Sequence, residues 1–228
     1  MIAESVQIKT DAFAILYAPY GNDIVQKVVE HHEANGGMSR FDKIKFYHES
    51  FLNKKNTNEE ISDMAKQFSE LVIEKVIEAP YLPGVLEYIQ NSYKQYKLFI
   101  STGTPTAEMK QILDGRKIAQ YFEAVFGSPD KKKIHIKSIL SIYDMTSEEL
   151  LFYGDSNTDL DAAENANIAF VLIKNSFNKK LAGKYKGKII NNFIGLTWDL
   201  RKSKSFVKNF SRTKYPLAHG NRYPMAPF

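Results

Sequence analysis

Two carboxylate side chains stand directly after an apolar segment of the chain. The segment Leu150–Tyr153 leads through Gly154 to Asp155, and Asp159 follows four positions later. An apolar run that ends in glycine predicts a buried strand, and open α/β sheets bind their ligands beyond the carboxyl ends of such strands. Carboxylate oxygens are the preferred ligands of hard cations such as Mg²⁺. We therefore interpret Asp155 and Asp159 as a metal site; the alternative is a turn residue followed by a helix cap.

A hydroxyl residue follows a second apolar run. Thr102 comes directly after Leu98–Ser101 and precedes Gly103. A hydroxyl group and the backbone N–H groups before a helix bind phosphate oxygens, which makes Thr102 and Gly103 candidates for phosphate binding. Ser101 takes this place if the strand is shifted by one residue. A plain strand end or helix cap is the alternative without chemistry.

A lysine supplies the opposite charge. Lys132 lies in the run Lys131–Lys133, shortly after the sequence Gly127-Ser128-Pro129. A lysine ammonium is a compact cation that can compensate a cluster of carboxylates and phosphate oxygens. Its two neighbours in the run are alternatives for the same role, and a run of lysines is also typical of a solvated surface.

These candidate residues need a parallel sheet to bring them together. Beyond residue 80, apolar runs alternate with helical patterns, which predicts βαβ units with helices on both faces of the sheet. The predicted strands are 97–101, 123–126, 150–153, 168–173 and 187–190. Residues 11–79 instead carry apolar residues at helical spacing, with Asp11 as the expected N-cap. The sequence therefore predicts a helical module at 11–79 and an α/β core at 80–200.

Composition restricts the classes of protein that fit. The chain has 228 residues, which suffice for one core and a smaller module, and it contains no cysteine. Disulfides, thiolate catalysis and cysteine–zinc sites are thereby excluded. The N-terminal residues lack the pattern of a signal peptide, and no apolar run is long enough to cross a membrane. We expect a cytoplasmic protein.

The positive charge of the chain comes from its C-terminal segment. Residues 201–228 contain seven lysines and arginines and no acidic residue, whereas the whole chain carries +5, so residues 1–200 carry −2. A basic segment can contact nucleic acid or acidic lipid. This one lacks apolar periodicity, so we interpret it as a disordered, solvated tail and expect no nucleic-acid partner.

Taken together, the motifs resemble those of the haloacid dehalogenase (HAD) superfamily of phosphohydrolases. The resemblance is to the branch with a small helical cap, which includes phosphoglycolate phosphatases and β-phosphoglucomutases. Three of the four core motifs of that family occur here in its order, as Thr102, then Lys132, then Asp155 with Asp159. In addition, residues 31–41 resemble the cap segment of the family in which an arginine, here Arg40, reaches the substrate.

The resemblance implies a fold and an activity. It implies a Rossmann-like α/β core with a small α-helical cap, and Mg²⁺-dependent hydrolysis of a small phosphomonoester, such as a sugar phosphate or phosphoglycolate, through an aspartyl-phosphate. Thr102 and Lys132 would be catalytic, and both would bind substrate together with Gly103 and Arg40. Asp155 and Asp159 would hold the metal. The partner would be a small phosphorylated metabolite, and the protein would be a monomer or homodimer.

One motif of the family has no counterpart here. The family places Asp-x-Asp, which contains the nucleophile, on the first and central strand of its sheet. Residues 2–6 of this chain resemble the sequence that follows that motif in the family. We therefore expect residues 1–10 to be a remnant of this loop. The central strand would be missing, and the truncated chain would be inactive as it stands. The alternative is a non-catalytic, HAD-like protein that binds phosphate or has a regulatory role.

Overall fold

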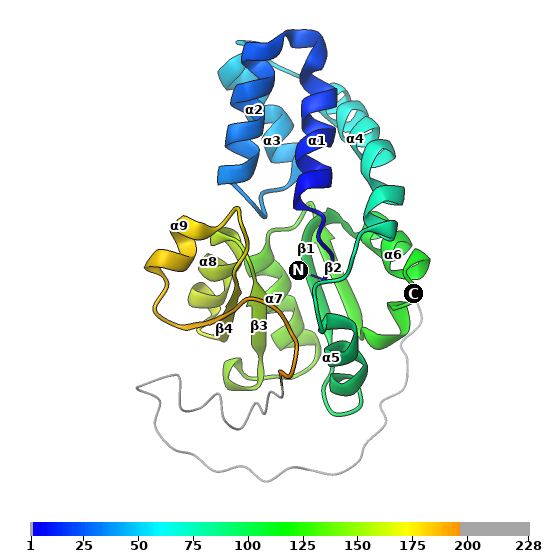
Figure 1. Cartoon of the computed structure of the whole chain (residues 1–228), viewed down its shortest axis with the longest axis vertical. Helices are drawn as coiled ribbons and strands as arrows, with labels where there is room; N and C mark the ends of the chain where they lie inside the picture. The colour runs from blue at the N-terminus through cyan, green and yellow to red at the C-terminus, as the bar shows by residue number, and fades with distance from the viewer. Residues whose placement is uncertain (1, 197–228) are drawn as a thin grey trace.

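The computed structural model describes residues 2–196 and divides them into a helical cap and an α/β core (Figure 1). The cap is built from α1 (Val6–Tyr17), the short 3₁₀ helix η1 (Ala18–Tyr20), α2 (Asn22–Ala34), α3 (Arg40–Phe51) and α4 (Asn58–Glu78). The cap stands over one end of the core, and the chain enters the core through the segment after α4.

The cap has a continuous aromatic interior. Phe13 of α1 packs at 4.4 Å from Phe68 of α4 and meets Tyr47 of α3 edge-on at 5.6 Å, measured between ring centroids. Tyr17 meets the same Tyr47 edge-on at 5.4 Å. Edge-to-face pairs of this kind stabilise a core beyond the area that they bury. These contacts tie three helices of the cap together.

The first helix begins earlier than the sequence pattern indicated. Asp11 was expected to cap a helix, but α1 begins at Val6 and Asp11 lies inside it, where it accepts a hydrogen bond from Gln7. The reason is that Thr10, Phe13 and Tyr17 form one buried face that extends the helix toward its N-terminus. The prediction of Asp11 as the N-cap was therefore wrong, because the N-cap is Ser5.

The core alternates strands and helices, as predicted. Its elements are α5 (Val85–Ser92), β1 (Phe99–Pro105), α6 (Thr106–Gly115), η2 (Ala119–Tyr121), β2 (Ala124–Ser128), α7 (Lys132–Ile142), η3 (Ser147–Glu149), β3 (Leu151–Gly154), α8 (Asn157–Ala166), β4 (Ala169–Ile173), α9 (Lys179–Lys184) and β5 (Lys188–Ile190). All the strand pairs are parallel, and the strands end at the edge that faces the cap. This is the Rossmann-like α/β fold with a helical cap that the sequence predicted.

The strands of the core form two separate sheets. One contains β1 and β2, and the other contains β3, β4 and β5 in that order. Within residues 2–196, no ladder hydrogen bond joins β1 to β3. Consecutive residues of both strands, 99–101 and 151–153, border the same cavity. We call the space between these two strand edges the slot.

Two expectations concern other parts of the chain. The basic segment 201–228 lies outside the described residues. Within the described part, no helix is both long and apolar enough to span a membrane.

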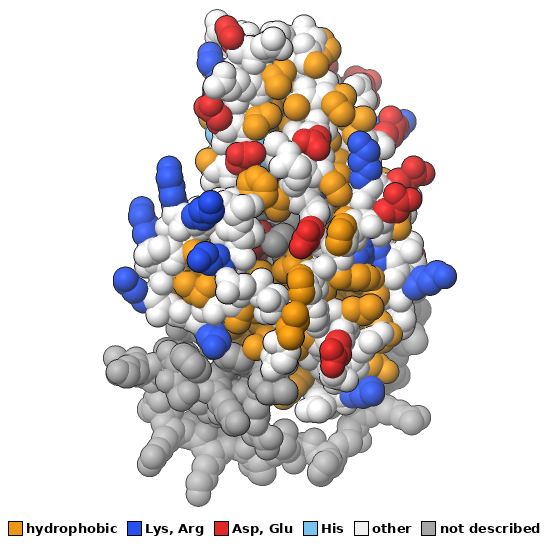
Figure 2. Space-filling model, viewed as in Figure 1, with side chains coloured by type: hydrophobic (Ala, Val, Ile, Leu, Met, Phe, Trp, Pro, Cys, Tyr) orange, Lys and Arg blue, Asp and Glu red, His pale blue; other side chains and the backbone are white. Residues whose placement is uncertain are grey.

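On the face shown in Figure 2, basic side chains gather over α9, which contributes Lys179, Lys180 and Lys184.

Candidate functional site

The loop after β3 presents its side chains at the carboxyl edge of the core. β3 ends at Gly154, and α8 begins at Asn157 with Ser156 as its N-cap. Ser156 and Asp159 form a capping box, in which the Asp159 side chain also accepts hydrogen bonds from the backbone N–H groups of Asp155 and Ser156. Such a box satisfies N–H groups that a helix start leaves unpaired. The loop is thereby fixed by its own sequence.

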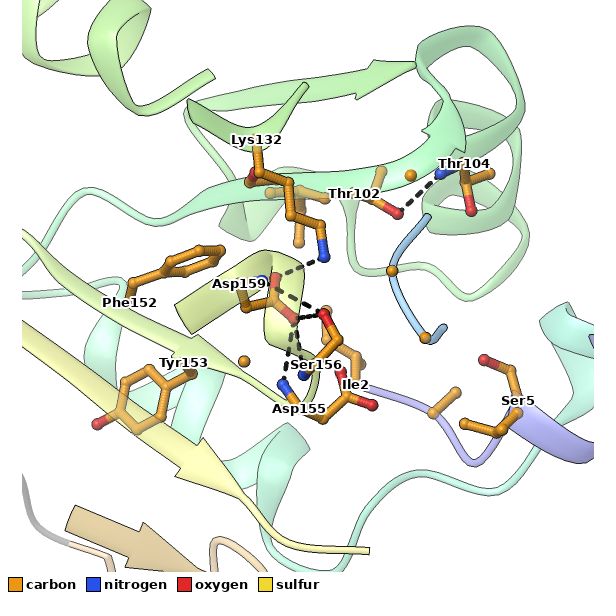
Figure 3. A pocket seen from close by; sticks show the side chains of 18 of the residues that line it. Ile2, Ser5, Thr102, Thr104, Lys132, Phe152, Tyr153, Asp155, Ser156 and Asp159 are labelled. Atoms are coloured by element: carbon orange, nitrogen blue, oxygen red, sulfur yellow. Dashed lines mark hydrogen bonds and ion pairs between the residues drawn. The ribbon is translucent and has the colours of Figure 1, made fainter. Parts of the chain in front are cut away.

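Asp159 forms a buried ion pair with Lys132. The Lys132 ammonium lies 2.5 Å from Oδ1 of Asp159, and Figure 3 shows the lysine reaching down to it from the start of α7. Burial raises the pKa of Asp159, but the Lys132 charge and hydrogen bonds from Lys132 and Ser156 outweigh it, so the pKa lies below its ordinary value. Of the lysines in the run, Lys132 is therefore the one that meets this carboxylate.

Asp155 keeps a free carboxylate oxygen in the pocket. Its Oδ2 atom accepts a hydrogen bond from the Asn175 side chain, and its backbone carbonyl accepts one from Asn178. No hydrogen bond from the described residues occupies Oδ1. Both oxygens of Asp159, in contrast, are engaged by Lys132, Ser156 and backbone N–H groups. Asp155 is thus the carboxylate that is available to a ligand.

The two candidate hydroxyl residues of β1 point to different partners. The Ser101 hydroxyl lies 3.0 Å from Nδ1 of His135, whose Nε2 in turn lies 3.1 Å from the Gly127 carbonyl. The Thr102 hydroxyl lies beside the pocket and accepts a hydrogen bond from the Thr104 N–H (Figure 3). This geometry favours Thr102 over Ser101 as the phosphate-binding hydroxyl.

A glycine loop of the cap lies directly on this site. Gly37 has φ +81°, and a Cβ atom there would collide with the side chains of Ser156, Thr158 and Lys132. A Cβ on Gly103 would press against the Gly37 carbonyl oxygen. Glycine is needed at position 37 for both its left-handed backbone and its close approach. The cap therefore closes over Lys132 and the loop after β3.

Arg40 is held at the junction between cap and core. Its guanidinium forms a bidentate ion pair with Glu108 of α6, with N–O distances of 2.6 and 2.7 Å. It also donates a hydrogen bond to the Ser69 hydroxyl. It lies 4.7 Å above the ring of Phe68. Arg40 borders the pocket, but these partners already occupy three of its five N–H groups. Its role in substrate binding stays a prediction.

The pocket and the slot form one cavity of about 940 Å³. Its upper part is bordered by the cap loop and the groups described above, and its lower part by the facing edges of β1 and β3. Figure 3 shows Phe152 and Tyr153 of β3 on one side of this space and the Thr102 segment on another. Among the residues from 2 to 196, no three acidic or histidine side chains converge as a ready-made metal cluster.

Two charged residues of this region were missed by sequence reasoning. Glu108 is 7% exposed and holds Arg40, and Lys9 of α1 borders the pocket. Burial and the Arg40 charge lower the pKa of Lys9, whereas Glu108 and Asp155 raise it. Neither residue belongs to a motif, because their positions depend on how the cap docks on the core.

Comparison with known proteins identifies the family. The sequence profile of the haloacid dehalogenase-like hydrolases matches residues 3–173. The chain belongs to this family. The phosphoglycolate phosphatase of Salmonella typhi is 30% identical over 118 residues, which is 50% of this chain and 46% of that enzyme. This HAD-like chain spans about half the length of the curated relatives that it matches.

Solved HAD structures share the fold. A β-phosphoglucomutase from Clostridium difficile superposes with a TM-score of 0.72 at 20% identity, covering 92% of this chain and 95% of that one. The HAD hydrolase YfnB from Bacillus subtilis, solved with bound magnesium, gives a TM-score of 0.60 at 15% identity, covering 86% and 92%. The arrangement of cap and core is thus that of known HAD structures.

Proposed function

We propose that this HAD-like chain supplies the phosphate- and Mg²⁺-binding groups of a hydrolase for small phosphomonoesters, such as phosphoglycolate or a sugar phosphate. The observation that carries the proposal is the convergence of Thr102, Lys132 and Asp155 at the carboxyl edge of the core, beneath the Gly37 loop. The likeness to phosphoglycolate phosphatases supports the same substrate class.

Thr102 and Lys132 have different roles in the proposed binding of phosphate. Thr102 donates its hydroxyl proton, and the backbone N–H group of Gly103 donates to a further phosphate oxygen. Lys132, held in place by Asp159, adds a positive charge beside the phosphate. Phosphoryl transfer depends mainly on positioning and on neutralising charge, which is what these groups provide.

Asp155 fits a Mg²⁺ site. Mg²⁺ in proteins is held by one or two carboxylates and completes its shell with water and substrate phosphate, and Asp155 has one carboxylate oxygen without a protein partner. Asp159 then acts through Lys132 and the loop rather than as a direct ligand. When bound, Mg²⁺ supplies charge that offsets the repulsion between the phosphate and an anionic nucleophile.

The slot is the proposed place of the nucleophile. Formation of an aspartyl-phosphate requires a carboxylate aimed at the phosphorus atom. The strand segments that border the slot, 99–101 and 151–153, carry no acidic side chain. We infer that an additional parallel strand pairs with β1 and β3 and carries this carboxylate beyond its end. Without it, residues 1–228 bind phosphate but form no aspartyl-phosphate.

A non-catalytic role is the second candidate. It is favoured by the engagement of Asp159 with Lys132 and Ser156, which leaves Asp155 as the carboxylate with a free oxygen in the core motifs. In that case the site would bind a phosphorylated metabolite and the cap would respond to its presence.

Phosphate binding tests the proposal. Isothermal titration of the full chain with inorganic phosphate in the presence of Mg²⁺ should give a measurable affinity, which we expect to fall about tenfold or more in Thr102→Val and Asp155→Asn. Ser101→Ala is the matched control, because the Ser101 hydroxyl is bound to His135. Equal affinities for the wild type and for the Thr102 and Asp155 variants would refute the proposed site.

A further inference from the structure

The cap wall of the pocket carries two ammonium groups that no carboxylate pairs with. Lys9 of α1 and Lys43 of α3 both border the cavity. Lys43 is 2% exposed, and its ammonium contacts Nδ1 of His32 at 2.9 Å and the His32 carbonyl oxygen at 3.2 Å. Neither partner is acidic. In the described part of the chain, the Lys9 ammonium has no hydrogen-bond or ion-pair partner.

Two other cations that border the pocket have a carboxylate partner. Arg40 is paired with Glu108, and Lys132 is paired with Asp159. Glu30 and Glu33 also border the cavity, but neither forms an ion pair with Lys9. Lys97, Lys179 and Lys180 of the core also border the cavity without an ion pair, but all three are exposed to solvent. Lys9 and Lys43 are instead the less exposed ammonium groups, and both belong to the cap.

The environment opposes these two charges when the pocket holds no anion. Burial and, to a smaller extent, the nearby Lys9 ammonium lower the pKa of Lys43 to about 7. The pKa of Lys9 is lowered first by burial and then by Arg40. The Glu108 and Asp155 charges oppose this lowering for Lys9 only in part, and neither carboxylate forms an ion pair with it. A buried ammonium without an ion-pair partner is stabilised when an anion arrives, because opposite charges within a few ångström favour the charged form.

We propose that Lys9 is a specificity-determining residue that binds a second anionic group of the substrate. The HAD site of this chain would thus prefer a phosphomonoester that carries a carboxylate or a second phosphate over one with a neutral alcohol or sugar portion. The inference rests on the proposed phosphate-binding function. The Thr102 and Lys132 side takes the phosphate to be cleaved, and Lys9, with Lys43 behind it, takes the other anion.

Lys43 supports Lys9 rather than replacing it. The Lys43 ammonium already contacts His32 twice, whereas the Lys9 ammonium has no hydrogen-bond partner among the described residues and keeps its donors free. Burial and Lys43 lower the pKa of His32 to about 2, so this histidine remains neutral and does not compete for the anion. Lys9 is therefore the residue whose replacement is informative.

The test compares four ligands on the full chain with Mg²⁺ present. Ethyl phosphate has a neutral tail, 2-phosphoglycolate adds a carboxylate, and propane-1,3-diyl bisphosphate adds a phosphate. Malonate carries two carboxylates and no phosphate. Affinities are measured by isothermal titration for the wild type, Lys9→Met, Lys9→Arg and Lys27→Met. Lys27 is an exposed lysine of α2 outside the cavity and serves as the matched control.

We expect the wild type to bind 2-phosphoglycolate or the bisphosphate about ten- to a hundredfold more tightly than ethyl phosphate, as for a charge-assisted hydrogen bond. Whichever of the two is preferred identifies the second anion. Lys9→Met should abolish this preference without changing the affinity for ethyl phosphate, and Lys9→Arg should retain it. Lys27→Met should behave as the wild type.

The binding results distinguish a wrong role for Lys9 from a wrong phosphate site. Equal binding of ethyl phosphate and both dianionic esters, or a preference that survives in Lys9→Met, would overturn the role of Lys9 while leaving phosphate binding intact. If ethyl phosphate does not bind but malonate binds the wild type and not Lys9→Met, the anion site stands and the proposed phosphate site fails. If neither binds, both are refuted.

Discussion

The cap and the core of this HAD-like chain differ in how closely their interiors are packed. The cap packs its aromatic side chains into one cluster, in which Tyr17 and Tyr47 are fully buried. The core instead has two sheets whose facing edges, at β1 and β3, border a cavity. Unpaired backbone groups at such edges are costly when they are buried.

The candidate phosphate site is assembled although β1 and β3 do not pair in one continuous sheet. Asp155 and Asp159 are fixed by the capping box of α8, Thr102 by its own turn, and Lys132 by its ion pair. Each of these is a short-range arrangement within or between neighbouring segments. The binding groups are therefore in place even though the space beneath them is open.

The largest difference between the two regions should appear when an aromatic ring is removed. Phe68 is 2% exposed in the cap, whereas Phe152 is only half-buried beside the slot. We expect Phe68→Ala to lower the free energy of unfolding by about 3–5 kcal/mol, the usual cost of a buried phenylalanine. Phe152→Ala should cost less than half of that. Urea denaturation measures both, and equal losses would contradict the view that the slot is open.

The ion pairs of the two regions give the next contrast. Lys132→Met leaves the buried Asp159 carboxylate without its cation, and we expect a loss of about 3 kcal/mol. Lys54→Met in the cap breaks an ion pair with Glu60 whose side chains are 53% and 43% exposed, so the midpoint of thermal unfolding should not change. A loss of the same size in both variants would show that Lys132 and Asp159 are not coupled as described.

Acid should weaken the core through the same pair. Because the pKa of Asp159 is lowered in the folded protein from its ordinary value of 3.8, its contribution to stability is complete above about pH 4 and is lost as the pH falls further. Denaturation between pH 6 and pH 3 should therefore show a steeper loss in the wild type than in Lys132→Met. Identical pH profiles would contradict the lowered pKa.

The smallest contrast concerns two capping boxes. Thr57 and Glu60 cap α4 at an exposed position of the cap, and Ser156 and Asp159 cap α8 in the site. Thr57→Ala and Ser156→Ala should each cost about 1 kcal/mol in unfolding experiments. Only Ser156→Ala should also weaken phosphate binding, because it removes a hydrogen bond that orients Asp159. Weakened binding in the Thr57 variant would indicate a global effect instead.

Sequence patterns predicted the parts of the site that are local. Gly154, Asp155 and Asp159 could be recognised because an apolar run, a turn and a helix start follow one another in the chain. The same holds for Thr102 after its strand. The order of elements and the fold class followed from the alternation of strands and helices, although their ends were displaced by a few residues.

The parts that depend on docking of the cap could not be predicted. Glu108 pairs with Arg40 across 68 positions of sequence, and Lys9 reaches the pocket only because α1 stands above the core. No periodicity or motif marks either residue. Arg40 was singled out by resemblance alone, and its buried ion pair with Glu108 is a contact between distant segments that sequence spacing does not encode.

The most direct test is to add a strand that fills the slot and to measure phosphatase activity. An apolar strand ending in Asp-x-Asp is fused ahead of Met1, and release of phosphate from 2-phosphoglycolate is followed with Mg²⁺. We expect hydrolysis at least about a thousandfold above that of the 228-residue chain, and none when both aspartates of the fused strand are replaced by asparagine. A fused chain that unfolds cooperatively but remains inactive, or equal activity without the strand, would contradict this expectation.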